Sequence, residues 1–365
     1  MKSSFESKQN RRRNIIWALA FVVIAAASVY AVKKVSGEFS ITKLRELLYG
    51  ASPIPVLLSF AALAGFFIFQ ALSLKTLLKS FGQETSLGKS IVFVSTDLYF
   101  SAITPSATGG QPACGYFMVR SGIPASCVTV CLVFNLAMYT LSIIIIGIAS
   151  ILIAPGIFNY FSTAAKILIL LGAFGLAMLA LLGIVITIKH SAIDRLASIV
   201  MKIGKKLRLI KGRSDEVSIL QWVEDYKGYA SQLKGHGPAL AKSLLYNTLH
   251  RLCQMSITML MYIAVTVGGS AGTWTVIRQG ALLLGAQSLI SIGSTFIPIP
   301  GAMGYTDLMM LNAFGKVMTY SEAASLELMS RSVSFYLCVI IAFLIVIIYS
   351  IRSSSSIPKT ISPYW

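Results

Sequence analysis

Two stretches of this sequence, ITPSATGGQ at Ile103–Gln111 and IPIPGAMGY at Ile297–Tyr305, interrupt apolar segments with proline and glycine. Proline lacks the N–H that would continue a helix, and paired glycine favours a turn. Each stretch precedes a short segment, a glycine (Gly122 or Gly315) and a long apolar segment. The sequence therefore predicts two broken or re-entrant helical hairpins. The expected hinge residues are Pro105, Gly109, Gly110 and Pro112 in the first stretch and Pro298, Pro300, Gly301 and Gly304 in the second.

The composition excludes a soluble globular protein. The chain has 365 residues, of which 56% are hydrophobic and 12% charged, and several apolar runs exceed the roughly 20 residues that cross a bilayer. We expect an all-α polytopic membrane protein with about seven full transmembrane helices and two broken hairpins. No signal-peptide cleavage site follows Arg11–Arg13, so the first apolar run is expected to be retained. The predicted spans include 14–35, 53–78, 124–153, 163–188, 238–267 and 322–351.

The distribution of basic residues predicts the orientation. Segment 189–237 is rich in lysine and arginine, which marks a cytoplasmic loop. The formal charge of +18 therefore indicates topology rather than nucleic-acid binding, because the basic residues flank the spans. We expect a multi-pass protein of the bacterial cytoplasmic (inner) membrane with both termini cytoplasmic. The mixed-charge stretch 33–50 has helical spacing of apolar residues and is expected to lie in the membrane interface.

The predicted topology makes the two broken regions copies of opposite orientation. We expect residues 1–365 to form one transmembrane domain, with a first inverted repeat at about 53–153 and a second at about 238–351. Inverted repeats with interrupted helices are typical of secondary transporters, whose sites lie near the membrane midplane. The alternative is that the prolines and glycines only kink structural helices.

Six charged residues fall within or at the ends of predicted spans, where an unpartnered charge costs several kcal/mol. Glu327 and Arg331 are four residues apart, which favours a helical ion pair. Arg331 is the strongest candidate for holding a lipid phosphate through parallel hydrogen bonds. The alternatives to a lipid-binding role are that Glu327 and Arg331 form a purely structural ion pair and that Arg120 lies at the membrane interface. Asp97 and Asp307 flank the breaks. Their candidate partners are Arg120, Arg251 and Arg331. The candidate lipid-binding or cavity residues are Asp97, Arg120, Arg251, Asp307, Glu327 and Arg331.

Catalytic and metal-binding patterns are scarce. The five cysteines form no CxxC pair, there are only three histidines, and no phosphate-binding GxxxxGK[ST] loop occurs. We therefore expect no enzymatic activity, no catalytic residue, no metal and no cofactor. The expected partners are membrane phospholipids, without nucleic acid, and the sequence leaves a homo-oligomer open.

The motif TPSATGGQP followed by Arg120 and Gly122, together with FIPIPGAMGYTD, Gly315 and the pair Ser330-Arg331, resembles the membrane domain of lysylphosphatidylglycerol synthases. This is the flippase-like membrane part of the multiple peptide resistance factor. The resemblance covers nearly the whole chain and implies a stand-alone member without the synthase domain. Ala302 and Asp307 depart from the family pattern, in which Gly and Glu are more usual, so the resemblance leaves the lipid substrate open.

The leading hypothesis is a lipid flippase or transporter that binds a phospholipid in a central cavity and moves it between leaflets. The resemblance suggests aminoacylated phosphatidylglycerol or another anionic or modified lipid. One alternative is a non-transporting partner of a lipid-modifying enzyme, docking through 189–237. Another is a membrane enzyme that modifies lipid headgroups, although the few histidines offer it little support.

Overall fold

The computed structural model describes residues 41–104, 107–206, 213–267, 272–295, 297, 302 and 304–354, and these contain helices and no strand. The predicted all-α class is confirmed. The predicted first span at 14–35 lies outside the described residues. The α-helices are α2 (Ile41–Gly50), α3 (Pro53–Ser80), α4 (Leu87–Ile103), α5 (Gly110–Arg120), α6 (Ala125–Ile153), α7 (Thr163–Ile188), α8 (His190–Lys206), α9 (Arg213–Gln232), α10 (Gly237–Thr266), α11 (Thr273–Ser294), α12 (Tyr305–Phe314), α13 (Tyr320–Arg331) and α14 (Cys338–Ser354).

The chain is a multi-pass membrane protein. Within the described ranges, five helical segments are long and apolar enough to cross a membrane: Pro53–Ser80, Ala125–Ile153, Thr163–Ile186, Thr273–Ser294 and Tyr320–Arg352. The fourth, α11, was expected to be part of a broken region. The predicted span 238–267 is helix α10, which has sufficient length but is not among the five. Its polar side chains, including buried His250 and Arg251, lower its hydropathy.

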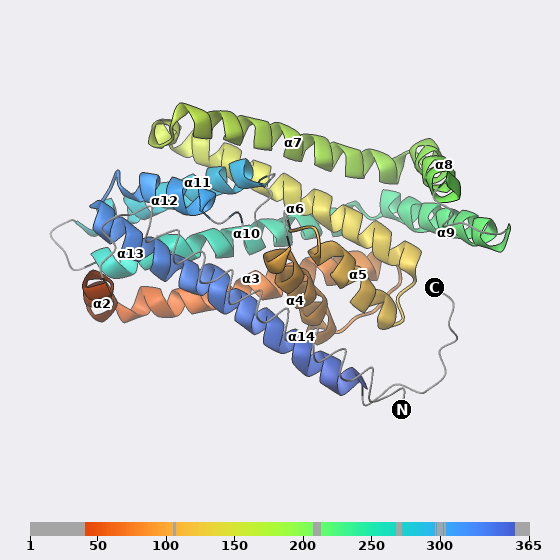
Figure 1. Ribbon diagram of the computed structural model, residues 1–365, viewed down its shortest axis with the longest axis horizontal. Helices are drawn as coiled ribbons and strands as arrows, with labels where there is room; N and C mark the ends of the chain where they lie inside the picture. Colours follow the sequence, from red (N-terminus) through yellow and green to blue (C-terminus); the bar gives the residue numbers. More distant parts are fainter. Residues whose placement is uncertain are drawn as a thin grey trace.

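Helices α3 and α10 pack against each other along their lengths and run in opposite directions through the middle of the molecule (Figure 1). At one end the backbone N–H of Ser52 donates to the carbonyl of Ala264 at 2.7 Å. At the other end the hydroxyls of Ser73 and Ser243 are 2.8 Å apart. The start of α3 thus meets the end of α10, and the end of α3 lies near the start of α10.

A buried polar network ties α6 to this antiparallel pair. The Ser73 hydroxyl donates to Oδ1 of Asn135 at 2.8 Å, and Nδ2 of Asn247 donates to the Ser73 hydroxyl at 2.7 Å. Asn135 is 6% exposed, and Ser73 and Asn247 are fully buried. Interhelical hydrogen bonds of this kind stabilise membrane bundles, because an unpaired polar group in hydrocarbon is costly.

The first predicted break separates α4 from α5. The Thr104 hydroxyl donates to the carbonyl of Phe100 at 2.7 Å and accepts from the N–H of Gly109 at 2.9 Å, which folds the chain back on itself. Of the predicted hinges, Gly109 precedes α5, whereas Gly110 and Pro112 belong to its first turn. Proline is tolerated there because first-turn N–H groups have no intrahelical partner. Pro105 lies outside the described residues.

The second break separates α11 from α12. Gly304 has φ of 81° immediately before α12, a conformation that favours glycine. Pro298, Pro300 and Gly301 lie outside the described residues. The two glycines that follow the short helices differ, because Gly122 has φ of 94° whereas Gly315 is right-handed at −61°. Their sequence correspondence therefore does not extend to backbone conformation.

The elements around the breaks pack in a corresponding way. In the first half α3 contacts α4, and α5 contacts α6; in the second half α10 contacts α11, and α12 contacts α13. Contacts also cross between the two halves: α4 of the first packs against α14 of the second, and α11 of the second packs against α6 of the first. Helix α7 crosses α11 closely at Gly172, where an added Cβ would lie 2.2 Å from the carbonyl oxygen of Ile292.

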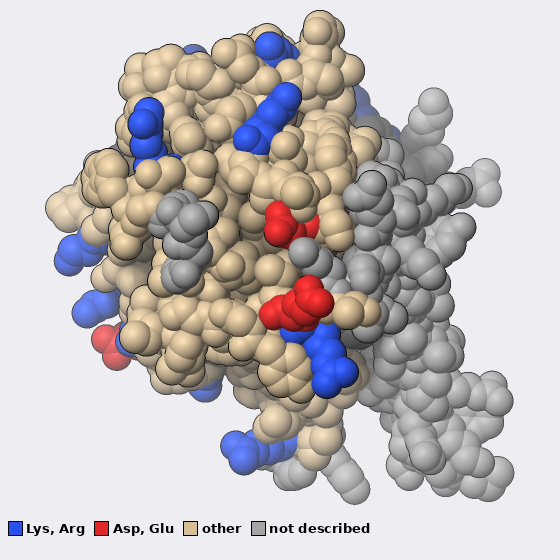
Figure 2. All heavy atoms as spheres, turned by 90° about the vertical axis from the view of Figure 1, so that its left-hand side faces the viewer, with Lys and Arg blue, Asp and Glu red and all other residues tan. Residues whose placement is uncertain are grey.

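The predicted basic loop 189–237 is largely a helical hairpin of α8 and α9, which lies at the opposite end of the bundle from the α6–α7 connection (Figure 1). Lys227 joins its helices, with Nζ 2.5 Å from Asp194 and 2.8 Å from Glu224. Part of the expected interfacial segment 33–50 is helix α2. Figure 2 views the end of the bundle at the left of Figure 1, where small acidic patches lie among scattered basic side chains.

Candidate functional site

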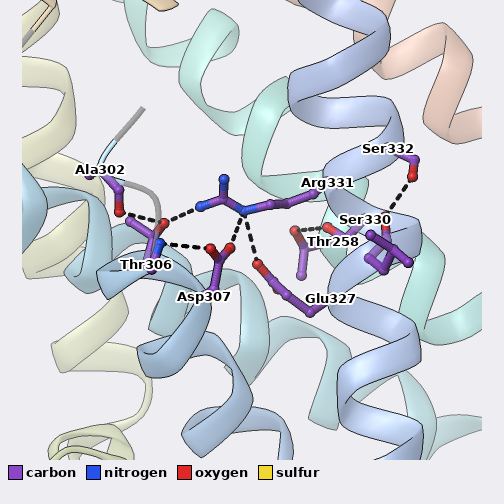
Figure 3. A network of polar contacts seen from close by, with 10 residues as sticks. Thr258, Ala302, Thr306, Asp307, Glu327, Ser330, Arg331 and Ser332 are labelled. Carbon is purple, nitrogen blue, oxygen red and sulfur yellow. Dashed lines mark hydrogen bonds and ion pairs between the residues drawn. The ribbon is translucent and has the colours of Figure 1, made fainter. Parts of the chain in front are cut away.

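The candidate site is a buried ionic cluster between α12 and α13, which we call the Arg331 cluster (Figure 3). Nε of Arg331 pairs with Oδ1 of Asp307 and with Oε1 of Glu327, the latter at 3.2 Å. Nη2 of Arg331 donates to the Thr306 hydroxyl. Asp307 is fully buried, Glu327 is 3% exposed and Arg331 is 8% exposed. Glu327 and Arg331 thus form the ion pair that their spacing indicates.

The residues that hold Arg331 also shape the second break. Oδ2 of Asp307 accepts the N–H of Gly304 at 2.8 Å, which caps the start of α12. The Thr306 hydroxyl donates to the carbonyl of Ala302 at 3.0 Å. Asp307 and Thr306 therefore contact both the broken backbone and the guanidinium.

Arg331 lies at an irregularity in its own helix. It is the last residue of α13, and residues Ser332–Leu337 continue toward α14 as a π-helical turn. Such turns often occur at functional sites. The guanidinium carbon lies 5.7 Å from the centre of the Phe335 ring. On the other side, the Ser330 hydroxyl is 2.7 Å from that of Thr258, which connects the cluster to α10.

The Arg331 cluster contains one guanidinium and two carboxylates. With both carboxylates ionised, its net charge is negative, which opposes the binding of a lipid phosphate unless a carboxylate leaves Arg331. Conversely, the same carboxylates could accept hydrogen bonds from an ammonium group. The cluster thus contains groups of both signs that can form ionic hydrogen bonds.

Asp97 lies apart from this cluster, in α4 at the first break. Its Oδ1 accepts from the Ser101 hydroxyl at 3.3 Å. An added Cβ on Gly110 would lie 2.2 Å from the same Oδ1, so the start of α5 is pressed against this carboxylate. Among the described residues Asp97 has no ion pair and does not meet Asp307.

The two other arginines are placed differently from each other. Arg120 is exposed at the end of α5. Arg251 is 7% exposed in α10, where Nη1 donates to Oε1 of Gln254. The sequence offered three arginines as partners for Asp97 and Asp307. Among the described residues, Arg331 pairs with Asp307, and none of the three pairs with Asp97.

Sequence reasoning missed three polar contacts around the predicted residues. Thr306 binds Arg331, Thr258 binds Ser330, and Tyr139 of α6 lies beneath Arg251, with 5.3 Å between the guanidinium carbon and the ring centre. Thr306 directly precedes Asp307, and this adjacency was the one feature of the sequence that could have pointed to its role. The other contacts join helices far apart in the chain, so no spacing rule reveals them.

Residues 15–342 match the family described as the lysylphosphatidylglycerol synthase TM region. The chain belongs to this family. The membership agrees with the resemblance seen in the two Pro/Gly stretches and associates this membrane domain with lipid modification or transport. A comparison with curated proteins gives no significant match.

Proposed function

We propose that this member of the lysylphosphatidylglycerol synthase TM region family binds a phospholipid headgroup at the Arg331 cluster and moves the lipid between leaflets. The observation that carries the proposal is the burial of Arg331, Asp307 and Glu327 beside a helix break in a membrane protein. Intramembrane ionisable groups are expensive and usually mark substrate pathways.

An inverted repeat would give this site a means of alternating access. We propose that α3–α6 and α10–α14 are the two copies. Support comes from the antiparallel course of α3 and α10 and from the matching contacts of α4 with α14 and α11 with α6. In transporters of this plan, one copy moves relative to the other around a fixed site.

We further propose that α8 and α9 lie on the cytoplasmic side of the inner membrane, together with both termini. The basic composition of 189–237 supports this orientation through the positive-inside rule. The α6–α7 connection, which lacks charged residues at 154–162, lies at the opposite end of the bundle. The first break would then open toward the cytoplasm and the second toward the outer side.

The proposed cycle uses exchange of ionic partners at Arg331 and involves no covalent chemistry. A headgroup phosphate replaces a carboxylate at the guanidinium, because the planar fork binds carboxylate and phosphate in the same way. The displaced Asp307 carboxylate must move, and because its Oδ2 accepts the N–H of Gly304 at 2.8 Å, the movement reaches the backbone there. Headgroup binding thereby changes the backbone at the second break.

The decisive experiment compares wild type with Arg331→Ala in two assays. Lipids that co-purify in native-lipid nanodiscs are identified by mass spectrometry, and the enriched lipid is then followed for leaflet exchange in proteoliposomes under imposed gradients. We expect enrichment and exchange in wild type and their loss in Arg331→Ala. Arg278→Ala, at an exposed arginine of α11, is the matched control.

The same experiment separates transport from a partner role. Wild-type exchange no faster than in empty vesicles would contradict the transport proposal. The alternative, a membrane partner of a lipid-modifying enzyme, is favoured by exposed apolar residues on α9: Val217 is 56% exposed, Leu220 50% and Trp222 36%. Such a surface outside the apolar spans can dock a soluble protein.

A further inference from the structure

Arg251 is a buried cation that has no ion pair among the residues the structure describes. The side chain is 7% exposed, and in the described part of the chain its one hydrogen bond joins Nη1 to Oε1 of Gln254. Nε is buried and has no hydrogen-bond partner there. The ring of Tyr139 covers one face of the guanidinium, with 5.3 Å from the ring centre to Cζ.

Among the described residues, no carboxylate forms an ion pair with Arg251. Four of the 13 acidic residues lie in the helices around the two breaks: Asp97, Asp307, Glu322 and Glu327. Asp97 accepts from Ser101, Asp307 and Glu327 pair with Arg331, and Glu322 accepts from the N–H and the hydroxyl of Thr319. The positive charge of Arg251 is therefore not compensated by any carboxylate among the described residues. An uncompensated buried charge is strongly destabilising, so a bound anion would relieve a cost already present in the fold.

Arg251 is separate from the Arg331 cluster but close to it along α10. Arg251 and Thr258 are seven residues apart, which puts them on one face of the helix with a rise of about 10 Å between them. The Thr258 hydroxyl is 2.7 Å from that of Ser330, the neighbour of Arg331. One phospholipid could therefore pass from one arginine to the other.

We propose that Arg251, Gln254 and Tyr139 form an anion subsite that holds the phosphodiester of a phospholipid. The subsite rests on the proposed lipid-binding function and adds a second phosphate position to it. A guanidinium can bind two phosphate oxygens in parallel. The amide nitrogen of Gln254 supplies a further donor, because Oε1 already faces Arg251. Gln254 and Tyr139 are partly exposed, which leaves the subsite a route from outside.

The test measures ligand affinity of the purified full chain in neutral detergent. The probes are phosphatidylglycerol, diacylglycerol with the same acyl chains and inorganic phosphate. We expect Arg251→Gln to weaken phosphatidylglycerol binding about tenfold or more, since hydrogen bonds to a charged group are lost. Arg251→Lys should bind at an intermediate level because it keeps the charge but loses the planar fork. Diacylglycerol binding should not change, and Arg278→Gln should behave as wild type.

Unchanged phosphatidylglycerol affinity in Arg251→Gln would overturn the subsite. If that variant does not fold, Arg251→Lys decides, and wild-type affinity there overturns it. Inorganic phosphate that binds as tightly as phosphatidylglycerol would assign the site to free phosphate and overturn the lipid assignment. Leaflet exchange is measured separately. An Arg251-dependent affinity without exchange supports the subsite and contradicts transport, whereas exchange with Arg251-independent affinity does the reverse.

Discussion

Ala107 and Ala302 share a left-handed backbone, with φ of 56° and 47°, and each lies three residues before the first residue of the short helix that follows its break, Gly110 or Tyr305. The two breaks thus turn by the same local device, although their sequences differ. A left-handed conformation costs an L-residue about 1–2 kcal/mol. The surrounding fold must supply that energy at both positions.

Substitution at these alanines should expose the strain. We expect Ala107→Val and Ala302→Val each to destabilise the protein by about 1–3 kcal/mol, because a β-branched side chain is a stronger outlier at positive φ. Thermal unfolding in detergent measures the effect. Ala164→Val lies at an exposed position in the first turn of α7 and should destabilise the protein by only a few tenths of a kcal/mol. Equal shifts at all three sites would show that the positive φ is not strained.

Gly110 should tolerate no side chain. An added Cβ would lie 2.0 Å from the Ser101 hydroxyl and 2.6 Å from the carbonyl oxygen of Asp97. Gly110→Ala must therefore move α5 away from α4, and we expect a loss of about 1–3 kcal/mol of stability. Gly115→Ala in the same helix, whose nearest contact would be 3.4 Å, should instead be stabilising. Thermal unfolding of the pair distinguishes steric exclusion from helix propensity, which alone would stabilise both variants.

The sequence predicts those features that local chemistry determines. The broken stretches contain Pro and Gly, and the i, i+4 spacing of Glu327 and Arg331 gives their ion pair, because both follow from the geometry of a single helix. The packing of α10 against α3 could not be predicted, since it depends on contacts between segments distant in the chain. For the same reason the sequence identified Arg251 as a buried charge but did not predict its contact with Tyr139.

The ion pair between Lys227 of α9 and Asp194 of α8, which we call the α8–α9 clasp, should depend on pH. Hydrogen bonds from Lys227 to Asp194 and then to Glu224 raise the pKa of Lys227 above its ordinary value of 10.5. The stabilisation is therefore fully present below about pH 10.5 and is lost as the pH rises through the higher pKa of the folded state. Protection of α8 from hydrogen exchange, taken relative to the intrinsic base-catalysed rate, should fall in that alkaline range in wild type. In Lys227→Met this protection should be lower at neutral pH and lack the alkaline step; identical profiles would exclude the α8–α9 clasp.

The coupling between Arg331 and Asp307 should be large. Arg331→Met alone leaves two buried carboxylates without their cation, and breaking a buried pair in this way costs about 3–5 kcal/mol. Adding Asp307→Asn removes one of those charges, so the double variant should be more stable than the sum of the single effects predicts, by about 1–3 kcal/mol. A double-mutant cycle of unfolding free energies measures this term, with Arg278→Met combined with Asp307→Asn as the uncoupled control. Additive effects in both cycles would mean that the ion pair contributes little to stability and that Asp307 acts chiefly as the cap of α12.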